Sequence, residues 1–193
     1  MRRRLLLLGL PLAGVGVPAV AATALAARLG DGRHVLLMRH ADAPGYDDPP
    51  GMRLDDCRTQ RNLGERGRQQ AHAMGQWLRA QGVAQAWVGS SPWCRCVETA
   101  RLLALGPVQV EPALGSFFAQ PQLAAARTAE LRALLQRLRA AQPPAPAHIL
   151  VTHQVNIRAY VGAAVSSAES VLVRVGPQGE PLDYEFVAAP LPR

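Results

Sequence analysis

The chain has 193 residues, of which 49% are apolar and 18% are charged, and its formal net charge is +7 at pH 7. This length and this apolar fraction predict one globular domain and exclude a disordered tail. All 21 basic residues are arginines, which excludes Schiff-base chemistry on a lysine and argues against a lysine-rich nucleic-acid arm.

The N-terminal segment differs from the rest of the chain. Arg2, Arg3 and Arg4 precede an uncharged run that ends only at residue 27. A basic start, an apolar stretch and small-residue motifs that end at Ala21 and Ala26 are typical of an export signal, and the run is also long enough to be a membrane anchor. We therefore expect residues 1–26 to be a signal peptide or an N-terminal anchor, residues 27–193 to be the functional domain, and the protein to be periplasmic or anchored in the inner membrane.

Strands and helices alternate along the remaining chain. The long loop 41–60, rich in proline, glycine and aspartate, is of a length that is usually functional. Ser91 and Pro92 predict the N-cap and first position of a helix. Alternating strands and helices favour an α/β fold, with a mostly parallel central sheet and helices on both faces. The expected strands are 33–38, 86–88, 108–110, 148–152, 170–175 and 182–187, and the expected helices are 65–81, 91–105, 121–140 and 155–162.

The three cysteines, Cys57, Cys94 and Cys96, all follow the export segment. In an oxidising compartment a bridge from Cys57 to Cys94 or to Cys96 is favoured over one between the two neighbouring cysteines, and three packed thiols are the alternative. Their spacing lacks the second ligand pair that a structural zinc site needs.

Two histidines follow the ends of predicted strands, His40 after 33–38 and His153 after 148–152. The carboxyl ends of parallel strands meet at one ligand crevice, so we expect both side chains to share a site. Arg39 precedes His40, and Arg95 lies in the first turn of the predicted helix 91–105. Two guanidinium groups beside a helix N-terminus favour a pocket for a phosphate dianion.

Four blocks of sequence follow one another along the chain: Leu37-Met38-Arg39-His40-Ala41, the stretch 62–71, the stretch 90–100 and Val151-Thr152-His153. Together they resemble the histidine phosphatase superfamily, in its phosphoglycerate-mutase-like branch 1, and the resemblance spans residues 33 to about 175. The stretch 57–63 and the variant His153-Gln154-Val155-Asn156-Ile157 suggest an exported proteobacterial subgroup. The resemblance implies the three-layer fold of that family.

The resemblance implies roles for these residues. His40 would attack phosphorus and become a phosphohistidine, while Arg39, Arg95 and His153 would hold the phosphoryl oxygens. No metal or other cofactor is implied. Many family members also carry a glutamate that protonates the leaving oxygen. Here Ser116 stands near that place, and Glu111 and Asp42 are weak candidates for the acid.

We therefore expect a metal-independent phosphatase that acts on a phosphorylated small molecule, such as an envelope sugar phosphate, with no nucleic-acid partner and membrane contact only through an uncleaved N-terminal segment. A protein phosphohistidine substrate would fit the compact length of the chain and the missing general acid, but it would need a cytoplasmic location. The alternative from another class is a non-catalytic phosphate-binding module. A metal site at His40 and His153 is disfavoured because Arg39 and Arg95 would repel a cation.

Overall fold

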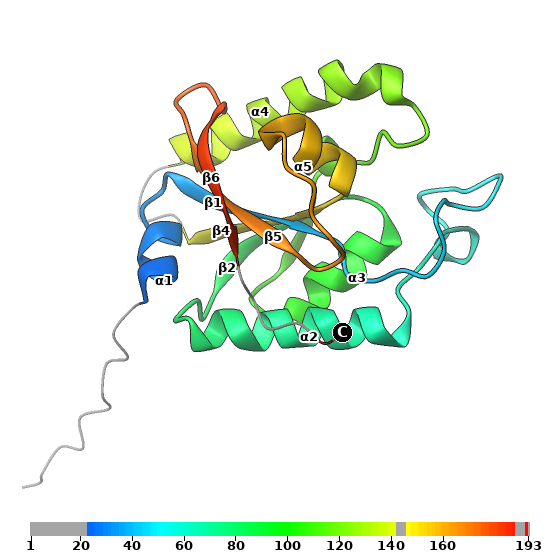
Figure 1. Ribbon diagram of the computed structural model, residues 1–193, viewed down its shortest axis with the longest axis horizontal. Coiled ribbons are helices and arrows are strands. Elements are labelled where there is room, and N and C mark those ends of the chain that lie inside the picture. The colour runs from blue at the N-terminus through cyan, green and yellow to red at the C-terminus, as the bar shows by residue number, and fades with distance from the viewer. Residues whose placement is uncertain (1–22, 142–145, 188–191, 193) are drawn as a thin grey trace, which may run out of the picture.

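The computed structural model describes residues 23–141, 146–187 and 192. A six-stranded sheet lies at the centre, in the order β3-β2-β4-β1-β5-β6, with helices above and below it (Figure 1). β1, β2, β3 and β4 run parallel, whereas β5 is antiparallel to both β1 and β6. The mostly parallel α/β sheet is therefore confirmed. Its strands are β1 (His34–Arg39), β2 (Ala86–Ser90), β3 (Val108–Val110), β4 (Ala147–Thr152), β5 (Ser170–Val175) and β6 (Pro181–Val187).

Two helical layers cover the two faces of the sheet (Figure 1). Alternate residues of β1 point to opposite faces of the sheet. Leu36 and Met38 pack with α2 (Glu65–Ala80) and α3 (Cys94–Leu103), and Val35 and Leu37 pack with α4 (Ala124–Ala140) and α5 (Gln154–Val161). The central strands are thus buried on both faces, as their continuous apolar runs predict.

Small residues let α2 lie close to its neighbours. A Cβ atom on Gly67 would lie 2.0 Å from the carbonyl oxygen of Asp42, and one on Gly75 would lie 2.2 Å from that of Leu103. These two glycines therefore fix how closely α2 approaches the loop after β1 and the end of α3.

The start of α3 differs from the prediction. The helix begins at Cys94, and Trp93, in an extended conformation, is its N-cap residue. Ser91 lies outside the helix, where its hydroxyl contacts His153 instead of capping the first turn in the expected way. Similarly, α4 begins at Ala124 because Pro121–Leu123 form a short 3-10 helix.

The N-terminal end of the described chain is the short helix α1 (Ala24–Leu29), which packs beside the sheet (Figure 1). Leu29 is buried, Leu25 and Ala26 pack against the same core cluster, and the hydroxyl of Thr23 donates to the carbonyl oxygen of Gln81. The predicted export segment otherwise lies outside the described residues. Within the described ranges, no helix has both the length and the apolar character that a membrane crossing requires.

Candidate active site

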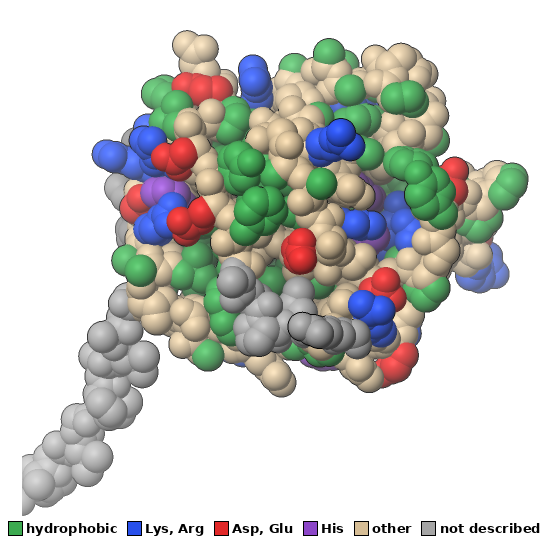
Figure 2. All heavy atoms as spheres, viewed as in Figure 1, with side chains coloured by type: hydrophobic (Ala, Val, Ile, Leu, Met, Phe, Trp, Pro, Cys, Tyr) green, Lys and Arg blue, Asp and Glu red, His purple; other side chains and the backbone are tan. Residues whose placement is uncertain are grey.

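The four predicted site residues meet in one cleft of about 910 Å³ at the carboxyl ends of the parallel strands. Arg39 is the last residue of β1, and His40 follows it. His153 follows β4, and Arg95 lies in the first turn of α3. In Figure 2, arginine and histidine side chains gather beside the loop that projects from the body of the protein. The clustering of these side chains, predicted from strand ends, is therefore found in the fold.

His40 is held in one orientation with one ring nitrogen available. Its Nδ1 lies 2.8 Å from the carbonyl oxygen of Ala41, and since a carbonyl only accepts, Nδ1 carries the proton. Nε2 therefore keeps its lone pair. Burial, reinforced by the charges of nearby arginines, lowers the pKa of His40 to about 3. The ring is thus a neutral base with a nucleophilic Nε2 at neutral pH.

Two arginines flank this nitrogen. The Nε of Arg95 donates to Nε2 of His40 over 3.3 Å, and the side chain of Arg95 is almost fully buried. One terminal nitrogen of Arg39 donates to the carbonyl oxygen of Val165, whereas its Nε is buried without a partner among the described residues. A buried, unpaired cationic donor is costly unless an anion satisfies it. The site is therefore built to receive an oxyanion beside His40.

His153 completes the set from the end of β4, the parallel neighbour of β1. The centres of its ring and that of His40 are 5.4 Å apart, and the Nε2 of His153 lies 2.8 Å from the hydroxyl of Ser91. Burial, together with the charges of His40 and the arginines, holds the pKa of His153 well below its ordinary value. His153 is therefore neutral and offers a single N–H donor.

Asp48, which the sequence did not single out for this role, lies against Arg95. Its two carboxylate oxygens accept from the two terminal nitrogens of Arg95 at 2.8 and 3.2 Å. They also accept from the indole N–H of Trp93 and the backbone N–H of Arg61. Burial alone would raise the pKa of Asp48, but these hydrogen bonds outweigh it, and the pKa lies below its ordinary value. Asp48 is thus an anion that fixes the plane of the Arg95 guanidinium group.

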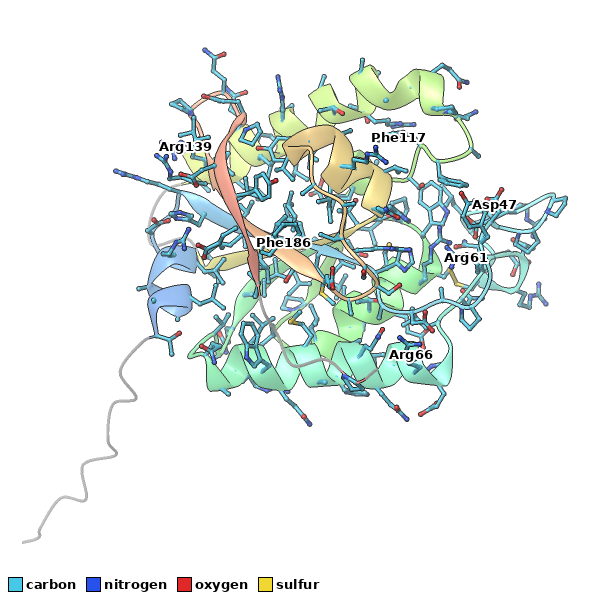
Figure 3. All side chains as sticks on the ribbon, viewed as in Figure 1. Asp47, Arg61, Arg66, Phe117, Arg139 and Phe186 are labelled. Carbon is cyan, nitrogen blue, oxygen red and sulfur yellow. A yellow bond between two sulfur atoms is a disulfide. The ribbon has the colours of Figure 1, made fainter. Side chains whose placement is uncertain are left out.

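Arg61 is a third arginine in the cleft that sequence reasoning missed. It lies, with Asp47, where the loop joins the body of the protein (Figure 3). Its Nη1 donates to the carbonyl oxygen of Ala43, and its Nε is buried without a partner among the described residues. Burial and the charges of Arg95 and Arg39 lower its pKa. The sequence did contain one indication that Arg61 belongs to the site, because Arg61 directly precedes the second of the four sequence blocks, the stretch 62–71.

The two candidate acids separate in the structure. Glu111 does not line the cleft, and its carboxylate lies 3.8 Å from Arg137 on α4. Asp42 lines the cleft two residues after His40, and Ser116 also lines it. Of the two carboxylates considered from sequence, only Asp42 is therefore placed near the reacting atoms. Within the described part of the chain, no three His, Cys, Asp or Glu residues are grouped as ligands for a metal ion.

Two more arginines, from α4 and α5, line the cleft. Arg127 on α4 lines it and pairs with Glu130 at 2.7 Å. Arg158 on α5 also lines the outer part of the cleft. The mouth of the cleft therefore carries positive charge beyond the innermost arginines.

A disulfide ties the loop to the site. Cys57 and Cys94 are bonded, and Cys96 is a buried free thiol. The bridge joins the short 3-10 helix Cys57–Thr59 to the residue directly before Arg95. In addition, the backbone N–H of Cys94 donates to the side-chain oxygen of Gln60. The loop that carries Asp48 and Arg61 is thus fixed to the start of α3.

The comparison with known protein families agrees with this arrangement. Residues 35–118 match the model of the histidine phosphatase superfamily (branch 1), a stretch that includes Arg39, His40 and Arg95. The chain is similar to this superfamily over that stretch. In the structure, the arginine of α3 donates from its Nε to Nε2 of the histidine that follows β1. No curated protein sequence matches the chain.

Solved structures of several phosphatases share the fold. The protein histidine phosphatase SixA complexed with tungstate is 19% identical, with a TM-score of 0.53, and the match covers 80% of this chain and 94% of that one. Mycobacterial glucosyl-3-phosphoglycerate phosphatase is 17% identical, with a TM-score of 0.54 and coverage of 80% and 96%. Phosphoserine phosphatase from Entamoeba histolytica, in complex with 3-phosphoglyceric acid, is 14% identical, with a TM-score of 0.58 and coverage of 81% and 98%. At these identities the likeness establishes the three-layer fold.

Proposed function

We propose that this protein is a metal-independent phosphatase that hydrolyses a phosphomonoester or a related phosphoryl compound through a phosphohistidine on His40. One observation carries the proposal: Nε2 of His40 is unprotonated and faces Arg95, while Nδ1 is anchored on the carbonyl of Ala41. A nucleophile aimed at a cluster of cationic donors is what phosphoryl transfer requires, because this chemistry depends on positioning and charge neutralisation.

The reaction has two steps. The lone pair of His40 Nε2 attacks phosphorus, the bond from phosphorus to the leaving oxygen breaks, and that oxygen leaves with the electron pair and takes up a proton. Arg39, Arg95 and His153 donate to the phosphoryl oxygens as the charge shifts. Water then attacks phosphorus, the P–N bond breaks, and phosphate leaves with His40 restored. No cofactor takes part, and the arginines around His40 would repel a divalent cation.

The substrate we propose is a phosphorylated small molecule in the periplasm, for example an envelope sugar phosphate. A cleft of about 910 Å³ has room for such a leaving group beyond the phosphoryl site. The Cys57–Cys94 disulfide favours an oxidising compartment. Three carboxylates line the cleft, those of Asp42, Asp47 and Asp48. Asp48 is ion-paired with Arg95, and Asp47 accepts from the backbone N–H of Asp48. Asp42 lies two residues after His40 and is the proton donor we propose.

The test is hydrolysis of 4-nitrophenyl phosphate in EDTA, because its good leaving group needs little help from an acid. We expect turnover by the full chain, loss of turnover in His40→Ala, and retention in His72→Ala, which changes an exposed histidine on α2. An alkaline quench should trap phosphate on His40, since P–N bonds survive alkali and not acid. Phosphate binding without turnover would instead support the non-catalytic module, and activity that EDTA removes and a divalent ion restores would contradict the mechanism.

A further inference from the structure

The end of β2 places a buried hydroxyl between Trp93 and His153. Ser91 is fully buried, and its Oγ lies 2.8 Å from Nε2 of His153. The same oxygen accepts a hydrogen bond from the backbone N–H of Trp93 over 3.3 Å. The Ser91 hydroxyl is thus part of a short chain of hydrogen bonds that leads to the second histidine of the cleft.

The direction of this chain follows from the donors available. A backbone N–H only donates, so Oγ accepts from Trp93 and has its own proton to give. That proton is best given to Nε2 of His153, which must then be unprotonated. Since a neutral imidazole carries one N–H, the proton of His153 resides on Nδ1.

The neighbouring thiol does not reverse this assignment. Sγ of Cys96 lies 3.5 Å from Nε2 of His153 and 3.8 Å from the carbonyl oxygen of Thr152. A thiolate there would draw a proton to Nε2. However, burial raises the pKa of Cys96 to about 12, so the group stays a neutral, weakly interacting thiol.

The opposite nitrogen of the ring is left for a ligand. Nδ1 of His153 has no hydrogen-bond partner within the part of the chain that the structure describes, and His153 lines the cleft 5.4 Å, centre to centre, from His40. We propose that Ser91 is a positioning residue that locks His153 as its Nδ1–H tautomer, so that this N–H faces the phosphoryl oxygens. This proposal rests on the proposed function for its catalytic consequence, but not for the tautomer itself.

Ser90 provides a matched control for this position. It is the preceding residue, is equally buried, and its hydroxyl donates to the carbonyl oxygen of Ser91 and not to His153. Ser90→Ala and Ser91→Ala therefore each remove one buried hydroxyl from the same strand end. Only the second removes the donor to Nε2.

The decisive measurement is the tautomer of His153 in the free, full-length protein labelled with ¹⁵N, read from two-bond ¹H–¹⁵N correlations of the imidazole rings. The His153→Gln variant identifies the signals. We expect a protonated Nδ1 and a bare Nε2 in the wild type and in Ser90→Ala, and a mixture of tautomers in Ser91→Ala. An Nε2–H tautomer in the wild type, or an unchanged Nδ1–H tautomer in Ser91→Ala, would overturn the proposal. If Ser91→Ala does not fold, the wild-type tautomer alone decides.

Turnover gives a second reading. On 4-nitrophenyl phosphate we expect Ser91→Ala to lower kcat about 10-fold or more with a smaller change in KM, as is common when a partner that orients a functional histidine is removed. Ser90→Ala should stay within about 2-fold of the wild type. If the wild type shows the Nδ1–H tautomer and no turnover, the proposed function fails while the lock on His153 stands. Equal loss of kcat in both variants would contradict a specific role for Ser91.

Discussion

The Asp48 carboxylate forms a bidentate ion pair with the Arg95 guanidinium group, accepting from its two terminal nitrogens at 2.8 and 3.2 Å. This leaves the Nε edge of Arg95 turned toward Nε2 of His40. A guanidinium group has a second bidentate edge between Nε and one terminal nitrogen, and here that edge faces the place of the phosphoryl group. Asp48 therefore orients Arg95 from behind without occupying the edge that the phosphoryl group needs.

Asp48→Asn should lower kcat about 10-fold and destabilise the fold. An amide accepts through one oxygen only, so Arg95 loses one charge-assisted hydrogen bond, worth about 1.5–3 kcal/mol. The free energy of urea unfolding and the kinetics on 4-nitrophenyl phosphate measure the two effects. Asp55→Asn, on the same loop and highly exposed, is the matched control. Equal behaviour of the two variants would refute the orienting role of Asp48.

Arg61→Met should raise the KM for phosphoryl substrates about 10-fold, because it removes a cation and a buried Nε–H from the cleft. Arg58→Met is the control, since Arg58 belongs to the same loop but is exposed and pairs with Asp56. Competitive inhibition by inorganic phosphate should weaken in parallel in Arg61→Met alone. A phosphate inhibition constant that stays at the wild-type value would place Arg61 outside the binding site.

The double variant Cys57→Ser, Cys94→Ser should lose about 3–4 kcal/mol of unfolding free energy, because the bridge closes a long chain segment with a sequence separation of 37. We also expect lower kcat, since the loop that carries Asp48 is then less tightly fixed beside Arg95. Reduction of the wild type with dithiothreitol should reproduce both changes. Cys96→Ala, which leaves the bridge intact, should not respond like the double variant and should stay sensitive to the reductant.

Stability should fall as the pH falls below about 6.5. Histidines in an unfolded chain titrate near that value. In the folded protein, burial lowers the pKa of His40 to about 3 and that of His148 below its ordinary value. Below pH 6.5 these histidines therefore bind protons in the unfolded state but not in the folded state. Each of them lowers the free energy of unfolding by about 1.4 kcal/mol per pH unit, until the pH reaches its pKa in the folded protein.

Urea unfolding at intervals between pH 7.5 and 4.5 measures this slope. His148→Gln should reduce it, whereas His72→Gln should not, because His72 is exposed. A free energy of unfolding that does not change between pH 6.5 and 5 would show that these histidines accept protons freely in the folded state. The lowered pKa of Asp48 acts in a separate range, below about pH 4, where protonation of the carboxyl removes its stabilising contribution.

Periodicity and the strand-end rule were enough to predict the sheet and to bring His40 and His153 together. Both depend on regular geometry that the pattern of apolar residues specifies. Asp48 and Arg61 lie on an irregular segment. Its path is fixed by a disulfide and by hydrogen bonds from Trp93 to the side chain of Asp48 and from the backbone N–H of Cys94 to the side chain of Gln60. Such a path has no period in the sequence, so the roles of these residues emerge only in the fold.

Ser91 illustrates a different limit. A serine before a proline and a helical pattern predicts an N-cap, and the local sequence contains nothing that contradicts it. The competing partner, His153, is 62 residues away and reaches Ser91 only because β2 and β4 are neighbours in the sheet. The tertiary contact therefore overrides the local preference.

The docking of α1 makes the two expected processing positions unequal. A peptidase that cut after Ala26 would divide the helix Ala24–Leu29, and would remove Leu25 and the contact from Thr23 to Gln81. A cut after Ala21 would leave the helix whole, with Thr23 still able to cap it. If a leader is present and is removed after the chain has folded, the helix would protect the later position. Mass spectrometry of the processed protein should then find an N-terminus at Ala22 and not at Ala27.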